Sequence, residues 1–340
     1  MKRLLLLLVF IPFIAIAQSK KSSSKKPPFI ESITSDTVKG LFYQVLFSYD
    51  QSNRVIDITN KEFKITSGHN KKKTTVEQII RQQTFEYVGN AVNPFLRKIE
   101  VYEFNADSEK WYLASKAEQY FLYENGKRIG DSTLLLERNE DSENWEEKVK
   151  KRIGFLKQTS KEIYHEMDLM KPGNDPMDDI RNIYMDKFTL TSQSNIRYDS
   201  SEHLYANHGG GRSYFTFSKY DSMINPLNQL NIANILVNEK ICLYDGNDFQ
   251  NHNQFWEIFR GGHYGNVDFS WYFITQNNPV NYFTTVNDQS SPFKSIFTLK
   301  YTYNPFKQPI YAKAQIKLVF KGEERFYKNH QSNITFRYKK

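Results

Sequence analysis

Apolar and polar residues alternate along most of the chain, in runs that short polar segments separate. Residues 41–49 (LFYQVLFSY) are followed by the polar residues 50–53 and by a second, β-branched run at residues 54–58. An aromatic run, a polar turn and a returning run are typical of a β-hairpin. The same order recurs around Gly89-Asn90 and around Asn125-Gly126. Asn-Gly favours a type I′ turn, because both central residues of that turn need a positive φ.

One stretch of eleven residues occurs twice. Residues 101–111 (VYEFNADSEKW) return as residues 135–145 at an offset of 34, with six identities. These are Glu103/Glu137, Asn105/Asn139, Asp107/Asp141, Ser108/Ser142, Glu109/Glu143 and Trp111/Trp145. A repeat of this size usually copies one supersecondary unit that is completed by its neighbours. The two acidic segments are therefore interpreted as two copies of one turn between long strands.

The second copy continues into a segment that fits two structures. Between residues 145 and 156 the apolar residues suit an amphipathic helix as well as a strand. The equivalent positions of the first copy, within residues 111–122, keep no apolar stripe at helical spacing. We therefore predict strands in both copies. Residues 111–123 would form one strand of about 40 Å, well above the usual length.

These patterns predict an all-β fold: an extended antiparallel meander of long hairpins forming a twisted sheet. Phe and Tyr, at 26 and 22 residues, suit strands. One short helix is expected near residues 177–185, after a loop rich in Pro and Gly. The expected organisation is a signal peptide (1–17), a flexible basic tether (18–28), N-terminal hairpin repeats (29–166), a loop with the short helix (167–190) and a C-terminal hairpin region (191–340).

The first 17 residues have the three parts of a secretory signal. Lys2 and Arg3 precede an apolar run, and Ala15-Ile16-Ala17 gives the small-residue cleavage pattern. The apolar run is shorter than the roughly 20 residues that span a bilayer. We predict cleavage after Ala17 and an exported mature chain, periplasmic or extracellular, without a transmembrane segment. The single cysteine, Cys242, excludes an intramolecular disulfide.

The positive charge of the chain lies largely in its N-terminal residues. The formal net charge is +8, and removing Lys2, Arg3 and the four lysines of residues 18–28 leaves 8 − 2 − 4 = +2. A nucleic-acid-binding protein concentrates basic charge on its folded surface. A body with a charge of +2 argues against nucleic acid as a partner.

Several segments resemble known families. Trp111 with residues 120–126 (YFLYENG) resembles the tandem W…YxYDxNG hairpins of exported bacterial proteins, which are similar to YD/RHS repeats. Residues 220–231, 278–280 and 301–309 resemble a family of secreted bacterial β-proteins known only as a domain of unknown function. The copy that begins at Trp145 departs from the hairpin pattern, with residues 156–158 (LKQ) in place of a Tyr-Asp pair. The resemblance implies exported hairpin proteins and no catalytic residue.

The candidate catalytic residues lie at two glycine clusters. Residues 207–211 (NHGGG) are similar to the oxyanion loop of lipases, but the chain has no G-x-S-x-G nucleophile motif. His208 could combine with Arg260 and His263 of the second cluster in acid–base chemistry. The seven histidines lack the H-x-x-x-H spacing of a metal site, so neither a metal nor a cofactor is expected.

Aromatic side chains are the stronger indication of function. Trp111, Trp145, Trp256 and Trp271 are candidate ligand-binding residues, because rings with polar tips suit sugar and protein surfaces. Our leading hypothesis is an exported, non-enzymatic β-repeat protein with a binding or structural role at the cell envelope, whose partner is an envelope protein or a polysaccharide. The alternatives are an exported hydrolase that uses the His/Gly-rich region and a polysaccharide-binding module.

Overall fold

The structure is a computed structural model that describes residues 26–37, 40–67, 73–105, 107–137, 150–170, 182–205, 211–230, 232, 275–287, 293–320 and 323–340. These residues form sixteen antiparallel strands and one short 3-10 helix, η1 (Asn228–Leu230). The strands are β1 (Ile30–Ser35), β2 (Leu41–Tyr49), β3 (Val55–Ser67), β4 (Lys73–Glu86), β5 (Leu96–Asn105), β6 (Lys110–Glu124), β7 (Lys127–Glu137), β8 (Lys150–Gln158), β9 (Glu162–Met170), β10 (Asn182–Leu190), β11 (Ile196–Tyr205), β12 (Gly211–Ile224), β13 (Asn277–Asn287), β14 (Phe293–Tyr303), β15 (Pro309–Phe320) and β16 (Glu323–Tyr338). The predicted all-β antiparallel meander is confirmed.

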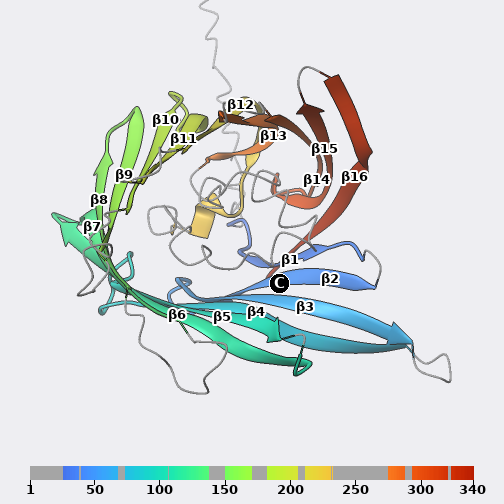
Figure 1. Cartoon of the computed structure of the whole chain (residues 1–340), viewed down its shortest axis with the longest axis horizontal. Helices are drawn as coiled ribbons and strands as arrows, with labels where there is room; N and C mark the ends of the chain where they lie inside the picture. The colour runs from blue at the N-terminus through green and yellow to red at the C-terminus, as the bar shows by residue number, and fades with distance from the viewer. Residues whose placement is uncertain are drawn as a thin grey trace, which may run out of the picture.

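The meander closes into a barrel, which the sequence did not predict. Each strand pairs with its sequence neighbours, and β1 also pairs with β16, from Ile30 opposite Tyr338 to Ser35 opposite Ile334. Viewed along the barrel, the strands form a ring (Figure 1). The expected twisted sheet is therefore replaced by a closed one. Closure removes the two strand edges that an open sheet would leave unpaired.

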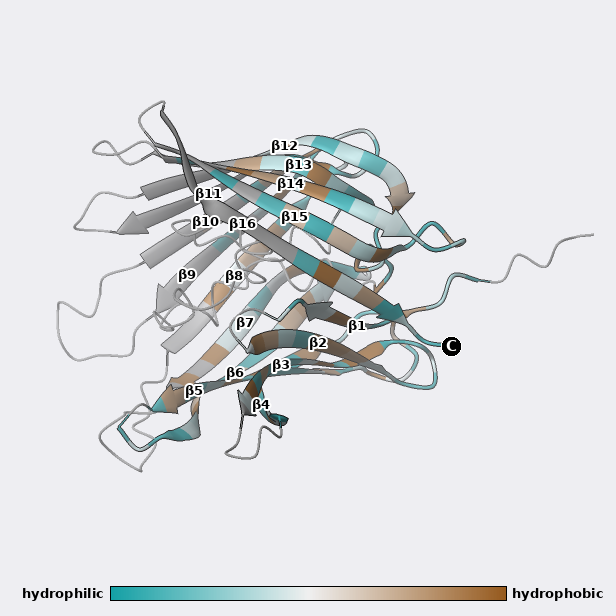
Figure 2. Cartoon of the chain, turned by 90° about the vertical axis from the view of Figure 1, so that its right-hand side faces the viewer, coloured by the Kyte–Doolittle hydropathy of each residue, from teal (hydrophilic) through white to brown (hydrophobic). Residues whose placement is uncertain are grey.

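One end of the barrel, called here the short-turn end, carries the tight connections. It consists of residues 50–54, 87–95, 125–126, 159–161, 191–195 and 304–308, together with both ends of the described chain. It lies on the right in the side view of Figure 2. Asn125 and Gly126 connect β6 to β7 with φ values of 50° and 74°, which confirms the predicted type I′ hairpin.

Side-chain oxygens fix several of these turns. Asp50 Oδ1 accepts hydrogen bonds from the backbone N–H groups of Ser52 and Arg54, both at 2.9 Å. At the β14–β15 turn, Asn304 Oδ1 accepts from the backbone of Phe306 and Gln308 at 2.9 and 3.0 Å. Asp50 and Asn304 each follow a tyrosine in the sequence and form a turn. Asp and Asn favour turns because their side chains hydrogen-bond to the nearby backbone.

The β8–β9 turn uses a hydroxyl instead. Thr159 Oγ1 accepts from the backbone N–H groups of Lys161 and Glu162 at 3.2 and 3.0 Å. The copy without a Tyr-Asp pair therefore still makes a hairpin, one residue beyond Gln158. The predicted strand after Trp145 is confirmed for residues 150–158.

Six tyrosines at the ends of described strands share one contact, called here the tyrosine contact. Each lies near the end of an even-numbered strand and donates its hydroxyl to a backbone carbonyl near the start of the preceding strand. The O···O distances are 2.5 to 3.0 Å, for Tyr49 to Ile30, Tyr87 to Val55, Tyr123 to Pro94, Tyr220 to Ile196, Tyr301 to Pro279 and Tyr338 to Pro309. The contact ties the two strands of each pair together at the short-turn end.

The repeated stretch forms the connection between β5 and β6 at the opposite end. Asn105 Oδ1 accepts a hydrogen bond from Ser108 N at 2.8 Å, and Glu109 has a φ of 52°. The interpretation of this acidic segment as a turn between long strands is confirmed for the first copy. In the second copy, residues 138–149 lie outside the described residues.

The predicted helix near residues 177–185 is wrong over its described part. Residues 177–181 are not described, but β10 begins at Asn182 and pairs with β9 and β11. Lys187 is exposed and Phe188 is fully buried, which is the alternation of a strand. Pairing with β9 and β11 satisfies the backbone hydrogen bonds of β10. The structure of this segment is therefore set by its neighbours in the sheet rather than by its own sequence pattern. The boundary placed at residues 167–190 is not marked by a break in the sheet, since β9 and β10 both lie there.

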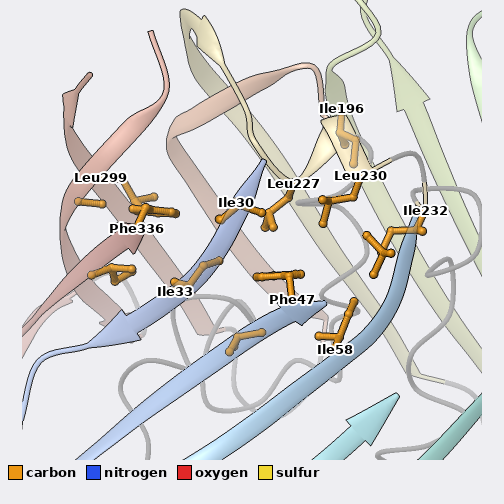
Figure 3. Close-up of a cluster of buried hydrophobic side chains, with 14 of the residues drawn as sticks. Ile30, Ile33, Phe47, Ile58, Ile196, Leu227, Leu230, Ile232, Leu299 and Phe336 are labelled. Atoms are coloured by element: carbon orange, nitrogen blue, oxygen red, sulfur yellow. The ribbon is translucent and has the colours of Figure 1, made fainter. Parts of the chain in front are cut away.

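The core lies inside the barrel. Inward-facing apolar residues of many strands meet Leu227, Leu230 and Ile232, which follow β12 and belong to no strand (Figure 3). The short helix η1 lies within the ring of strands (Figure 1). The barrel is therefore filled by its own chain near the short-turn end.

A hydrogen-bond network holds the two ends of the connection between β12 and β13. Asp221 Oδ1 accepts from the backbone N–H groups of Met223 and Asn278 at 2.9 and 3.2 Å, and Tyr303 donates its hydroxyl to Asp221 Oδ2. Asn225 Nδ2 donates to the carbonyl of Thr275 at 2.8 Å. These bonds position the segment from which Leu227 and Leu230 reach the core.

Candidate functional site: the polar inner wall

Most of the predicted site residues lie outside the described part of the chain. This holds for His208, Arg260 and His263 and for Trp145, Trp256 and Trp271, so their roles stay predictions. Trp111 is described: it lies on β6, is partly buried, and packs against the core and Phe104, with ring centroids 5.7 Å apart. Its ring is thus engaged in packing and is only partly accessible to solvent.

Within the described ranges, no group of three His, Cys, Asp or Glu side chains is placed to hold a metal ion. The same residues include no helix with the length and apolar character needed to cross a bilayer.

A group of buried polar side chains lines the barrel instead, on the inner face of four consecutive strands, β4 to β7. We call this group the polar inner wall. Its members are at most 7% exposed; they are Arg81, Gln83, Arg97, Gln119, Arg128, Asp131 and Thr133. Elsewhere, the buried residues that face the interior are mainly apolar. The wall is thus a polar surface enclosed by an otherwise apolar barrel.

The strand register places three members of the wall in one row. Arg97 on β5 lies opposite Gln119 on β6, which lies opposite Thr133 on β7. Arg97 donates from Nη1 to Gln119 Oε1 at 3.4 Å. Residues opposite one another on adjacent strands have Cβ atoms about 5 Å apart. The three side chains therefore form one continuous surface.

The next row toward the short-turn end contains an ion pair. Arg128 donates from Nη2 to Asp131 Oδ2, and their side chains are 1% and 0% exposed. The guanidinium carbon of Arg128 lies 4.8 Å from the ring centre of Phe121, a cation–π arrangement. Among the described residues, Nε and Nη1 of Arg128 and Oγ1 of Thr133 have no hydrogen-bond partner. Buried polar atoms are normally hydrogen-bonded, so these atoms call for a polar partner that the described residues do not supply.

A tyrosine borders the wall. Tyr123 lies opposite Arg128 in the register, and burial raises the pKa of its hydroxyl to about 12, although the charge of Arg128 acts in the opposite direction. The hydroxyl is therefore a proton donor at neutral pH, in agreement with its hydrogen bond to the carbonyl of Pro94 at 2.7 Å.

Sequence reasoning missed the wall, although its signal is in the strand pattern. Arg97 shares a face of β5 with the buried Ile99 and Val101, whereas Lys98 and Glu100 occupy the other face. A charged residue on the apolar face of an alternating strand is the feature that would have identified it. Burying a charge is costly unless it is paired or hydrogen-bonded, so such a residue calls for an explanation.

The wall is rich in hydrogen-bond donors. It combines three guanidinium groups with one carboxylate, together with amide and hydroxyl groups. The planar fork of a guanidinium matches the two oxygens of a carboxylate or phosphate. The arrangement is therefore suited to hold an oxyanion or a ligand with several hydroxyl groups.

The outer face of the barrel is charged. Ion pairs join neighbouring strands there, at N···O distances of 2.5 to 3.6 Å; they are Lys61–Glu77, Lys98–Glu86, Lys116–Glu100 and Lys187–Glu162. Lys300, Lys313 and Arg337 are exposed on β14 to β16. Apart from the polar inner wall, the described strands therefore carry mainly apolar side chains on the inner face and many charged side chains on the outer face.

Together, these features define a closed antiparallel β-barrel with a polar inner wall. Among solved structures, the chain is similar to a porin-like protein from Bacteroides vulgatus, at 10% identity and a TM-score of 0.48, over 92% of this chain and 99% of that chain. It is also similar to a porin-like protein from Bacteroides uniformis, at 10% identity and a TM-score of 0.44, over the same shares of the two chains. No family model and no curated protein matches the sequence.

Proposed function

We propose that this chain is an exported, non-enzymatic β-barrel protein with a binding role at the cell envelope, and that the polar inner wall is its binding surface. The observation that carries the proposal is the enclosure of buried, donor-rich side chains by an otherwise apolar barrel. The expected secretory signal supports export. The ligand class that fits the wall is a small acidic compound, such as an acidic sugar.

A test uses the hydroxyl of Thr133. Thr133→Val keeps the shape of the side chain and removes Oγ1, which has no hydrogen-bond partner among the described residues. The variant should therefore fold, while its affinity for an acidic ligand should fall on the order of tenfold, as expected for one hydrogen bond to a charged group. Calorimetric titration with galacturonate, galactose and inorganic phosphate measures the effect.

The matched control is Thr335→Val, which changes an exposed threonine on the outer face of β16. It should bind as the unchanged protein does. The proposal is wrong if neither anion binds, if galactose binds as well as galacturonate, or if the two valine variants bind equally.

We further propose that the described outer wall faces water, so that the protein is attached to the envelope without being embedded in it. Exposed ion pairs contribute at most about 1 kcal/mol each in water. A charged side chain facing lipid costs about 2–4 kcal/mol at the bilayer midplane. Alkaline carbonate extraction of envelopes should release the protein into the soluble fraction, and its retention with integral proteins would contradict the proposal.

The hydrolase alternative requires a separate experiment. A broad hydrolase assay on the purified protein, with His208→Ala and His263→Ala variants, should show no activity that depends on these residues. Activity that both changes abolish would favour the hydrolase. The polysaccharide-binding alternative predicts binding to a glycan array that is lost in Trp271→Ala and kept in Thr133→Val.

A further inference from the structure

The short-turn end carries a net positive charge on its exposed, described side chains. Apart from side chains in ion pairs, eight exposed cations lie in its turns, within two residues of them or at the chain ends: Lys26, Lys127, Lys157, Lys161, Arg197, Lys307, Lys339 and Lys340. Two exposed anions, Glu31 and Glu124, share this region. The net charge of these exposed side chains is 8 − 2 = +6. Exposed cations also outnumber exposed anions on the remaining described surface, where the anions are Asp107 and Glu109 and the cations are Lys64, Lys73, Lys110, Lys219, Lys300, Lys313 and Arg337. Charge alone therefore does not distinguish the short-turn end.

Large exposed apolar side chains occur in the same region. Within four residues of these turns lie Ile56, Val88, Val92, Leu122, Ile129, Phe155, Ile310 and Tyr311, between 37% and 66% exposed. Val88 and Val92, in the turn between β4 and β5, are the most exposed, at 66% and 65%. The short-turn end thus combines basic and apolar side chains.

Glycine makes part of this apolar surface continuous. In the register, Leu122 on β6 lies opposite Gly130 on β7, which lies opposite Phe155 on β8. A Cβ atom at Gly130 would lie 2.3 Å from the carbonyl oxygen of Gly154, so no larger residue fits between the two strands. Leu122 and Phe155, 47% and 61% exposed, therefore flank a position without a side chain.

The basic tether joins the barrel at this same end. The carbonyl of Phe29 accepts a hydrogen bond from Lys339 N at 2.9 Å, and the carbonyl of Pro28 accepts one from Gln308 Nε2 at 2.9 Å. Lys20, Lys21 and Lys25 precede this attachment in the sequence.

We propose that the short-turn end docks on an anionic lipid surface. Basic side chains are attracted to anionic headgroups, and apolar side chains beside them insert at the boundary with the acyl chains. Each lysine near such a surface contributes on the order of fivefold in affinity. The proposal concerns the end of the barrel and is independent of the polar inner wall.

Vesicle sedimentation of the purified exported chain tests the proposal. The chain should bind vesicles of phosphatidylcholine with phosphatidylglycerol, bind poorly to phosphatidylcholine alone, and lose affinity as salt is raised. The double variant Lys127→Glu/Lys157→Glu should bind at least about tenfold more weakly. Val88→Asp/Val92→Asp should also bind more weakly, because it replaces the two most exposed apolar side chains with anions without touching the core.

Matched controls come from the opposite end of the barrel. Lys64→Glu/Lys73→Glu reverses two exposed lysines near the ends of β3 and β4, and Val76→Asp changes a valine that is 54% exposed. Both should bind vesicles as the unchanged chain does. Equal loss in control and test variants would overturn the proposal, as would binding without phosphatidylglycerol. The proposal would also be overturned if the valine changes left binding intact and the chain bound a soluble polyanion such as dextran sulfate equally well. That result would identify an acidic polymer as the partner.

Discussion

At the scale of single residues, tyrosine hydroxyls join the strands in pairs. The tyrosine contact links a side chain at the end of one strand to the backbone at the start of the preceding strand, and it recurs on both sides of the barrel. Burial raises the pKa of Tyr49, Tyr87 and Tyr220 above the ordinary value, which keeps each hydroxyl protonated as a donor. A tyrosine near the end of a strand thus has the same structural role in all six strand pairs.

Removing one such hydroxyl should destabilise the protein. Tyr49→Phe leaves the carbonyl of Ile30, a residue that is 1% exposed, without its tyrosine donor. The expected loss is about 1–2 kcal/mol in the free energy of unfolding, measured by urea denaturation. Tyr120→Phe is the control: its hydroxyl bonds to Glu118 and the residue is 43% exposed, so a loss within about 0.5 kcal/mol is expected. Equal losses in both variants would contradict a special role for the tyrosine contact.

The raised tyrosine pKa values also predict alkaline sensitivity. Above the ordinary tyrosine pKa of about 10, the unfolded chain loses hydroxyl protons that the folded chain keeps, until the pH reaches the folded value, about 12 for Tyr123. The stabilisation that comes from the raised tyrosine pKa is therefore fully present below pH about 10 and declines between pH about 10 and 12. Urea midpoints should fall across this interval while tyrosinate absorbance rises on unfolding. A midpoint that stays constant over the interval would refute the prediction.

At the scale of elements, local turn chemistry determines the hairpins. The strands around residues 50–53, Gly89-Asn90 and Asn125-Gly126 could be predicted because the turn residues and the alternation lie close together in the sequence. Strand β10 could not, because its structure depends on pairing with β9 and β11 rather than on its own residues. The polar inner wall escaped prediction for a similar reason. Arg97 and Arg128 meet their neighbours across strands that come together only in the folded barrel.

The Asn-Gly turn offers a test at this scale. Gly126 has a φ of 74°, and a side chain in the left-handed region costs roughly 1–2 kcal/mol, so Gly126→Ala should destabilise the protein by that amount. No atom lies within 4 Å of the position of the added Cβ, so the cost is conformational rather than steric contact with the fold. Thermal and urea unfolding measure it.

The control for this turn is Asn125→Gly, because glycine, like asparagine, tolerates the φ of 50° at this position. It should leave the free energy of unfolding nearly unchanged. If Gly126→Ala is as stable as Asn125→Gly, the protein does not need glycine at position 126 for the positive φ of this turn.

At the scale of the whole molecule, the interior of the barrel is an apolar core to which a segment outside the strands contributes. Leu227 is 0% exposed and Leu230 is 5% exposed, and both pack with residues from strands on several sides of the ring. Strand alternation does not predict this packing, because Leu227 belongs to a connection rather than to a strand. The core holds the ring together from within.

Truncating this contribution should weaken the entire barrel. Leu227→Ala removes a fully buried side chain and should cost about 2–5 kcal/mol, seen as a lower urea midpoint for the whole unfolding transition. Leu122→Ala, on the outer face and 47% exposed, should cost much less. A Leu227→Ala variant as stable as Leu122→Ala would show that the interior segment does not support the strands.

Closure of the barrel by β1 and β16 has a consequence for the order of events when the protein is made. Ile30 must wait for Tyr338, the residue opposite it, because β16 follows all the other described strands in the sequence. Until then, both β1 and the newest strand expose unpaired backbone edges, which are templates for aggregation. A chain that emerges from a translocation channel N-terminus first would therefore carry an open seam throughout its passage, and a holding chaperone on the far side would protect it until the final strand arrives.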